Sequence, residues 1–167
     1  MNIKLKEKGF TIIEVVLVLA IAGLIFMMVF IALPALQRSQ RDTQRKNDLS
    51  RVQTAITNYT TANRGNLPNT LALWTSFVDS YLSMNGNDTF VDPSGPTTAQ
   101  TGATTYVLTP SVSVSITAPF STANQNIIYY TVGSVCGAVN TDVVAKGSRS
   151  VAFRMALESG GYDCRSI

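Results

Sequence analysis

One carboxylate stands inside a long apolar part of the chain. Glu14 is the fifth residue of a run over residues 10–36 that holds no other charged side chain. A charged residue within a membrane helix costs on the order of 2.5 to 3.5 kcal/mol on insertion scales. A plain membrane anchor gains nothing from that cost, whereas a helix that later leaves the lipid and meets a positive partner does. We therefore expect Glu14 to have a function.

The element that carries Glu14 is long enough to cross a membrane. A hydrocarbon core needs about 20 apolar residues, and the run has 27. The alternatives are a secretory signal or a plain signal anchor. A secretory signal has only about 7 to 15 apolar residues before a small-residue cleavage site, and both Gly9 and Glu14 count against a plain anchor.

The residues around this carboxylate resemble the start of a known family. The segment Lys8-Gly9-Phe10-Thr11-Ile12-Ile13-Glu14 is similar to the N-terminus of a type IV pilin precursor. The wider group with this N-terminus includes minor pilins and the pseudopilins of type II secretion. The resemblance covers residues 8 to about 68, and beyond that it is architectural.

The resemblance implies a maturation and an assembly step. A membrane-embedded prepilin peptidase would cleave after Gly9 and the new amine of Phe10 would be methylated. Glu14 would then meet the Phe10 amine of a neighbouring subunit. The residues expected to serve assembly are Glu14, Thr11, Gly23 and Pro34. In this family the helix often loses order between such a glycine and proline, although Pro34 lies further along than usual.

Residues after the apolar run continue the helix with one apolar face. No Gly or Pro occurs between Ala35 and Asn63, and apolar residues recur at helical spacing: Leu49, Val52, Ala55, Ile56, Tyr59 and Ala62. Arg64 and Gly65 then supply a cation and a glycine stop, and Pro68 follows. The sequence predicts one helix from Phe10 to about Asn63.

The remainder predicts a short helix and several strands. Residues 71–84 place Trp74, Phe77, Val78, Tyr81 and Leu82 on one helical face after a cap at Asn69 or Thr70. Strand patterns follow at residues 106–108, 111–116, 126–132 and 150–157. No helical pattern separates these strands, so antiparallel pairing is expected. Residues 93–102 are expected to form an exposed loop.

These elements give an α+β fold with a long N-terminal helix. Its apolar half would protrude, and its amphipathic half would pack on a small antiparallel sheet of three to four strands, as in pilins. The expected parts are a leader (1–9), a transmembrane and assembly helix (10–36), and a globular domain (37–167) made of the second helix half (37–64), a variable loop with the short helix (65–103) and a disulfide-closed sheet region (104–167).

The cysteine content favours a location outside the cytosol for the C-terminal domain, and the charge of the chain gives no support for a nucleic-acid partner. Removing residues 1–9, which hold Lys4, Lys6, Lys8 and Glu7, lowers the net charge from +3 to +1, so basicity gives no support for a nucleic-acid partner. Cys136 and Cys164 are the only cysteines. An even count favours one disulfide, which persists outside the cytosol, and a buried reduced pair is the alternative. A metal site needs three or four ligands, and the chain has no His.

A charged run follows the apolar segment and has two interpretations. It holds Arg38, Arg41, Arg45 and Lys46, with Asp42 and Asp48 between them. Such runs are usually solvated helix faces. In a bundle of helices they could instead pair between subunits and set the register. The sequence favours neither.

The sequence predicts a structural subunit and not an enzyme. No His, paired acids or phosphate loop supports catalysis or a cofactor. We expect a major pilin that is stored in the cytoplasmic membrane, N-terminus in and C-terminus out, and assembled with identical copies by the pilus machinery into an extracellular filament for adhesion, motility or DNA uptake. The alternatives are a minor pilin or secretion pseudopilin, and a monomeric membrane-anchored surface-binding protein.

Overall fold

The fold is described from a computed structural model. It describes residues 9–83, 90–94, 106–111, 115–116, 119–121 and 124–167. The chain divides into two compact units, Met1–Gln37 and Arg38–Ile167. The predicted strand at 111–116 lies mostly outside the described residues, apart from Ser111, Ser115 and Ile116.

The predicted long helix is present as α1, Ile12–Ala62, with 51 residues. It continues through Gly23 and Pro34, so the segment between them is helical here. At its end Arg64 takes a left-handed backbone conformation with φ 56°, and the N–H of Gly65 donates to the carbonyl of Thr60 at 2.7 Å. This hydrogen bond between residues five positions apart closes the last turn of α1. The helix therefore ends close to the position predicted from Arg64 and Gly65.

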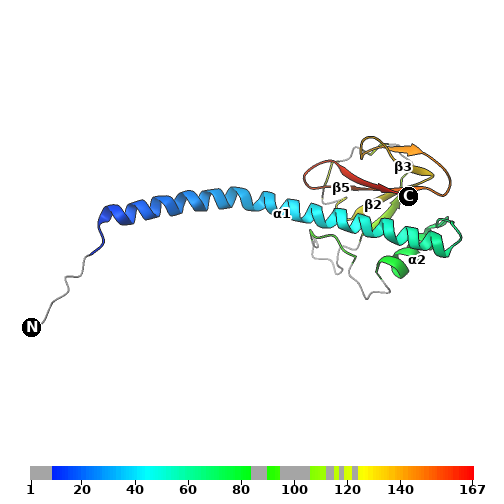
Figure 1. Ribbon diagram of the computed structural model, residues 1–167, viewed down its shortest axis with the longest axis horizontal. Helices are drawn as coiled ribbons and strands as arrows, with labels where there is room; N and C mark the ends of the chain where they lie inside the picture. Colours follow the sequence, from blue (N-terminus) through cyan, green and yellow to red (C-terminus); the bar gives the residue numbers. More distant parts are fainter. Residues whose placement is uncertain (1–8, 84–89, 95–105, 112–114, 117–118, 122–123) are drawn as a thin grey trace, which may run out of the picture. The chain divides into compact units, whose positions relative to one another are not determined.

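The Arg38–Ile167 unit adds one short helix and six strands to the second half of α1 (Figure 1). The predicted helix at 71–84 begins as α2, Leu71–Phe77, capped by Thr70, and continues as a π-helical turn η1, Val78–Leu82. The strands are β1 Val107–Pro110, β2 Ile127–Val132, β3 Ser134–Cys136, β4 Val143–Ala145, β5 Val151–Ala156 and β6 Tyr162–Ser166.

The main sheet has four strands in the order β1-β2-β5-β6. β2 and β6 both pair antiparallel with β5, which confirms the α+β fold with a largely antiparallel sheet. β1 pairs parallel with β2, so the prediction of purely antiparallel pairing was wrong at this edge. A parallel pair needs a crossover of a dozen or more residues, and residues 111–126 between the two strands are enough for one. A second sheet pairs β3 with β4.

The core lies between α1 and one face of this sheet. The predicted stripe of α1 is buried at Leu49, Val52, Ala55 and Ile56, with Tyr59 packed at its margin. The sheet contributes alternate residues of each strand: Leu108 of β1, Ile128 and Tyr130 of β2, and Val151, Phe153 and Met155 of β5. Trp74, Phe77 and Leu82 complete the core from α2 and η1, as their helical spacing predicts.

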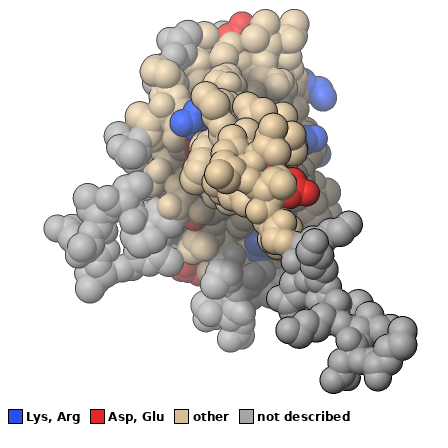
Figure 2. Space-filling view, turned by 90° about the vertical axis from the view of Figure 1, so that its left-hand side faces the viewer, with Lys and Arg blue, Asp and Glu red and all other residues tan. Residues whose placement is uncertain are grey.

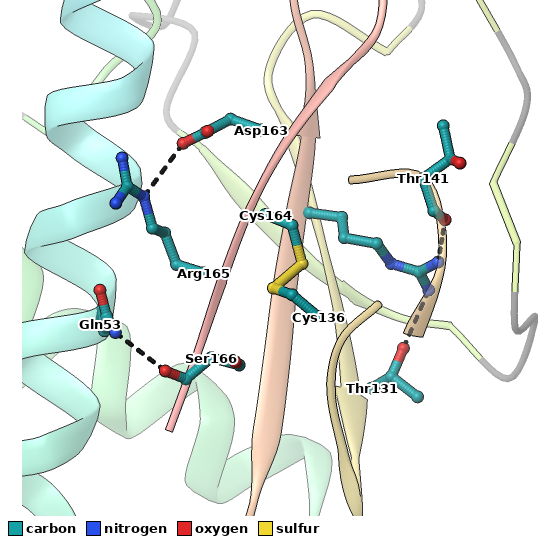
Figure 3. Close-up of a disulfide and its surroundings, with 9 residues drawn as sticks. Gln53, Thr131, Cys136, Thr141, Asp163, Cys164, Arg165 and Ser166 are labelled. Atoms are coloured by element: carbon teal, nitrogen blue, oxygen red, sulfur yellow. Dashed lines mark hydrogen bonds and ion pairs between the residues drawn. A yellow bond between two sulfur atoms is a disulfide. The ribbon is translucent and has the colours of Figure 1, made fainter. Parts of the chain in front are cut away.

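Strand β5 is covered on both faces, and all six of its residues are buried. Its second face packs Ala156 with Ile116 and Tyr162. On that face the buried guanidinium of Arg154 donates to the carbonyl of Thr141 at 2.7 Å and to the hydroxyl of Thr131 at 3.0 Å (Figure 3). A central strand buried on both faces explains why residues 150–157 give a clear strand signal.

The disulfide joins the two sheets. Cys136 ends β3 and Cys164 lies in β6, and their sulfurs are bonded in the structure (Figure 3). This confirms the predicted pair. Gln53 of α1 donates to the carbonyl of Ser166 at 2.8 Å, so β6 is held by the disulfide on one side and by α1 on the other.

Replacing both cysteines by serine is expected to lower the free energy of unfolding by about 3 to 4 kcal/mol, because the closed loop restricts the unfolded chain. Urea unfolding of the oxidised full chain in detergent micelles measures this, with fluorescence of Trp74, the only tryptophan, as the signal. Serine replacement of the exposed Thr75 of α2 is the control. A loss below about 1 kcal/mol, within the range of an ordinary substitution, contradicts the expectation.

Candidate functional site

The start of α1 is built around Glu14. Its Oε2 accepts hydrogen bonds from the backbone N–H of Thr11 at 2.8 Å and from the Thr11 hydroxyl at 2.7 Å. The N–H of Glu14 is 3.4 Å from the same hydroxyl oxygen. A threonine before the first helical residue and a glutamate three positions later form a capping box, which satisfies donors that the first turn leaves free. Thr11 therefore fixes where the carboxylate lies.

The residues before and after this box are open. Phe10 is 89% exposed, and a side chain added at Gly9 would meet no atom within 4 Å. From Phe10 to Leu36 the large apolar residues are exposed. By length and composition α1 is able to cross a membrane, since an 18-residue window reaches a mean hydropathy of 3.1. Nothing within the described part of the chain covers this apolar surface.

Comparison with known proteins gives one match at this end of the chain. Residues 4–30 match the family described as the prokaryotic N-terminal methylation motif. This is the prepilin-type leader of type IV pilins. The leader motif supports a type IV pilin or pseudopilin family, and the α+β fold is pilin-like. No curated protein and no solved structure matches the chain.

Apart from the leader motif, the structure brings the charged run of α1 into an internal ion network. Arg45 is fully buried. Its Nε and Nη2 donate to the two carboxylate oxygens of Asp92 at 2.7 and 2.9 Å, and its Nη1 donates to Glu158 at 3.0 Å and to Asp42 at 3.1 Å. One guanidinium therefore contacts three carboxylates.

The other members hold the same network to α1. Arg41 donates two bonds of 2.7 and 2.6 Å to Glu158. The carboxylate of Asp42 accepts the backbone N–H groups of Glu158 at 2.8 Å and of Ser159 at 2.9 Å. The Ser94 hydroxyl contacts Arg45 and donates to Glu158 at 3.1 Å. The turn between β5 and β6 and residues 92–94 are thereby tied to α1.

Both interpretations of the charged run fail at Asp42 and Arg45, which are buried and bound within their own unit. Arg41 is bound to Glu158 but is partly exposed. For the exposed loop predicted at residues 93–102, Pro93 and Ser94 do lie in a turn but are half-buried and not exposed, and residues 95–102 lie outside the described residues. Arg38 and Lys46 are exposed.

The network changes the acidity of its members. Hydrogen bonds from Arg41, Arg45 and Ser94 outweigh burial and lower the pKa of Glu158 to about 2. Burial acts to raise the pKa of Asp42, but the hydrogen bonds from Ser159, Glu158 and Arg45 outweigh it and keep that pKa low. The carboxylates of Glu158 and Asp42 are therefore ionised at neutral pH.

A second buried acid borders the network. Asp48 accepts the Tyr106 hydroxyl at 3.1 Å, and Arg51 lies 3.6 Å away. Burial is the main cause that raises the pKa of Asp48, and it also raises that of Tyr106. This pair ties α1 to the residue that precedes β1.

Sequence reasoning missed the partners of Arg41 and Arg45. Asp92 and Glu158 lie 47 and 113 positions from Arg45, and no local pattern relates residues at such separations. The available signal was weak: Asp92 borders a charge-free stretch over residues 93–141, whereas nothing in the sequence marks Glu158.

Replacing Glu158 by glutamine is expected to lower the free energy of unfolding by about 3 kcal/mol at pH 7, because the charge that faces Arg41 and Arg45 is lost. The folded pKa of Glu158 is about 2, below the usual value of about 4.3. Its contribution is thus complete above the unfolded pKa and is lost as pH falls toward 2. The difference between wild type and Glu158→Gln should shrink over that range.

Urea unfolding at several pH values, followed by Trp74 fluorescence, measures this difference. Asp79→Asn removes an exposed carboxylate and is the control, with an expected change below about 0.5 kcal/mol. An equal loss in both variants, or a difference that does not vary with pH, contradicts a stabilising role of the network.

Proposed function

We propose that this chain is a pilin, the major structural subunit of an extracellular type IV pilus filament. The observation that carries the proposal is Glu14, a single carboxylate at the start of an exposed apolar helix, within a prepilin-type methylation motif. The pilin-like α+β fold of the chain is consistent with it. An isolated anchor would not need the carboxylate.

Maturation removes the leader at Gly9. Cleavage between Gly9 and Phe10 by a prepilin peptidase frees the amine of Phe10, which is then methylated. The exposure of both residues and the open space around Gly9 support access to this peptide bond. The cut leaves the new amine one residue before Thr11 and therefore close to the carboxylate of Glu14 in sequence.

Storage in the membrane requires that the carboxylate be tolerated there. The two hydrogen bonds from Thr11 reduce its cost, because a buried charge is penalised least when donors satisfy it. The apolar segment 10–36 spans the membrane with the N-terminus in the cytoplasm and the C-terminal unit outside. The disulfide supports an external location for that unit, since such bonds persist outside the cytosol.

Assembly transfers the apolar helix from lipid to a bundle of identical helices. Glu14 of one copy meets the Phe10 amine of the next, which neutralises both charges in the bundle. A subunit placed out of step leaves both charges unpaired in an apolar core, which is penalised by several kcal/mol. The contact sets the axial step, while the apolar side chains supply the cohesion. Gly23 and Pro34 are weak points of the helix at which it can adjust to its neighbours.

Replacing Glu14 by alanine is expected to leave membrane insertion intact and to abolish or disorder filament assembly, because the charge that selects the axial step is gone. Fractionation shows insertion, and electron microscopy of sheared cell-surface material shows fibre yield. Asp79→Ala removes an exposed carboxylate of the C-terminal unit and serves as the control, with wild-type fibres expected. Normal fibre yield in Glu14→Ala would refute the proposed role.

Replacing Gly9 by valine is expected to block removal of the leader, because the peptidase must accommodate this residue next to the bond it cuts. The precursor should then keep its full mass on a denaturing gel. Gly147→Val is the matched control, since Gly147 is also exposed and has open space around it. Cleavage of Gly9→Val at the wild-type rate would mean that Gly9 does not define the site.

The fraction of fibre mass that this chain makes up separates a major pilin from its relatives. A major subunit dominates purified filaments, whereas a minor pilin or secretion pseudopilin is scarce in them. A monomeric surface-binding protein would give no fibres.

A further inference from the structure

In the Arg38–Ile167 unit most acidic side chains are buried, whereas several basic side chains are exposed. Its acids are mostly inside: Asp42, Asp48, Asp92 and Asp163 are buried, and the Glu158 side chain is 10% exposed. Among the described residues Asp79 is the one exposed acid of this unit, against five exposed cations, Arg38, Lys46, Arg64, Lys146 and Arg149. Figure 2 views the molecule from the N-terminal side of Figure 1 and shows few blue or red side chains there. The surface is thus more positive than the net charge suggests.

One of these cations, Arg149, lines a groove, and two others, Arg64 and Lys146, are close in the sequence to residues that line it. The groove measures about 650 Å³ and lies between the 65–71 loop, the end of β2 and the turn at 148–149. Arg149 lines it, Arg64 precedes the loop, and Lys146 begins the turn. The described lining contains no Asp or Glu, and no described carboxylate forms an ion pair with any of the three cations.

The guanidinium of Arg149 lies close to Gly65, just beyond the end of α1. A Cβ built on Gly65 would lie 3.6 Å from its Cζ and 3.7 Å from its Nη1, so the guanidinium passes directly over the glycine. Arg149 is exposed and forms no ion pair with a described carboxylate, so its positive charge is available to a ligand.

The rest of the lining offers groups that both donate and accept hydrogen bonds. These are the amides of Asn66 and Asn69 and the hydroxyls of Thr70 and Ser148. A sugar hydroxyl also donates and accepts, so it matches them, whereas a phosphate only accepts. Leu71 and Val132 are 66% and 45% exposed at the groove and offer apolar contact to the C–H face of a sugar ring.

The same groove is poorly suited to nucleic acid. Its aromatic residues, Trp74 and Tyr130, pack on each other with ring centroids 4.1 Å apart and are only 3% and 6% exposed. They cannot provide the open stacking surface that bases use. The one cation in the described lining, Arg149, would also neutralise few phosphates, and nucleic-acid affinity depends mainly on the number of phosphates neutralised.

We propose that this groove binds an acidic saccharide, with the carboxylate of one sugar unit on Arg149 and its hydroxyls on the amide and hydroxyl side chains. The carboxylate accepts two parallel N–H bonds from the guanidinium, the geometry that arginine favours. A volume of this size is typical of small-molecule sites. The site does not depend on filament formation, so it stands or falls separately from the proposed pilin function.

The test is a titration of the full chain in detergent micelles with a hexasaccharide of alternating glucuronate and N-acetylglucosamine. The ligand is raised to about 10 mM, because weak single-site binding falls in the millimolar range. Saturable binding is expected. Arg149→Gln should weaken it about tenfold or more, since a hydrogen bond between charged groups is lost. Reducing the carboxylates of the hexasaccharide to alcohols should weaken its binding to wild type by a similar factor. Wild type and Arg149→Gln should then bind the reduced sugar with equal affinity.

Arg38→Gln is the matched control, because it also removes an exposed arginine. Arg38 lies on α1 at the start of the Arg38–Ile167 unit, whereas the groove lies beyond the C-terminal end of α1. The control variant should leave affinity within about twofold, as screened charges at such distances contribute little. Circular dichroism and Trp74 fluorescence confirm that both variants are folded. Absence of saturable binding, equal weakening by both variants, unchanged affinity for the reduced sugar, or tighter Arg149-dependent binding of a short DNA duplex each overturns the proposal.

Discussion

The proposed assembly depends on the position of one negative charge, that of Glu14, in an apolar helix. Glu14 is held at the first turn of α1 by two hydrogen bonds from Thr11, so its carboxylate has a defined position. In a medium of low polarity a charge is tolerated only with donors or an opposite charge close by. Thr11 supplies the donors within one copy. In the proposed filament, the freed amine of another copy would supply the opposite charge, and this difference would make assembly selective.

The C-terminal unit handles charge differently. Asp42, Asp92 and Glu158 are directed inward onto Arg41 and Arg45, which fixes the β5–β6 turn to α1, while the disulfide fixes β6 to β3. Burial of the acids leaves exposed cations without a described carboxylate partner, and one of them, Arg149, lines the groove. The buried carboxylates therefore have two effects. They stabilise the fold through the ion network, and they are not available to neutralise cations on the surface.

The sequence predicts local features well and distant pairings poorly. Helical spacing gave the stripe from Leu49 to Tyr59, and residue count gave the disulfide. The short strands β3, β4 and β6 were missed, because three to five residues with little alternation carry no periodic signal. The parallel position of β1 depends on the path of its crossover, and the partners of Arg45 depend on the completed fold. The capping box of Thr11 and Glu14 was also missed, although a threonine followed three residues later by glutamate is a local pattern that could have indicated it.

The most direct measurement is an electron cryo-microscopy map of purified filaments that resolves side chains at Phe10 and Glu14. The account predicts the Phe10 nitrogen of one copy within about 4 Å of the Glu14 carboxylate of a neighbour, the range of an ion pair, with density for an N-methyl group. A carboxylate that faces water or lipid, or that contacts only its own Thr11 with no cationic group nearby, would contradict it.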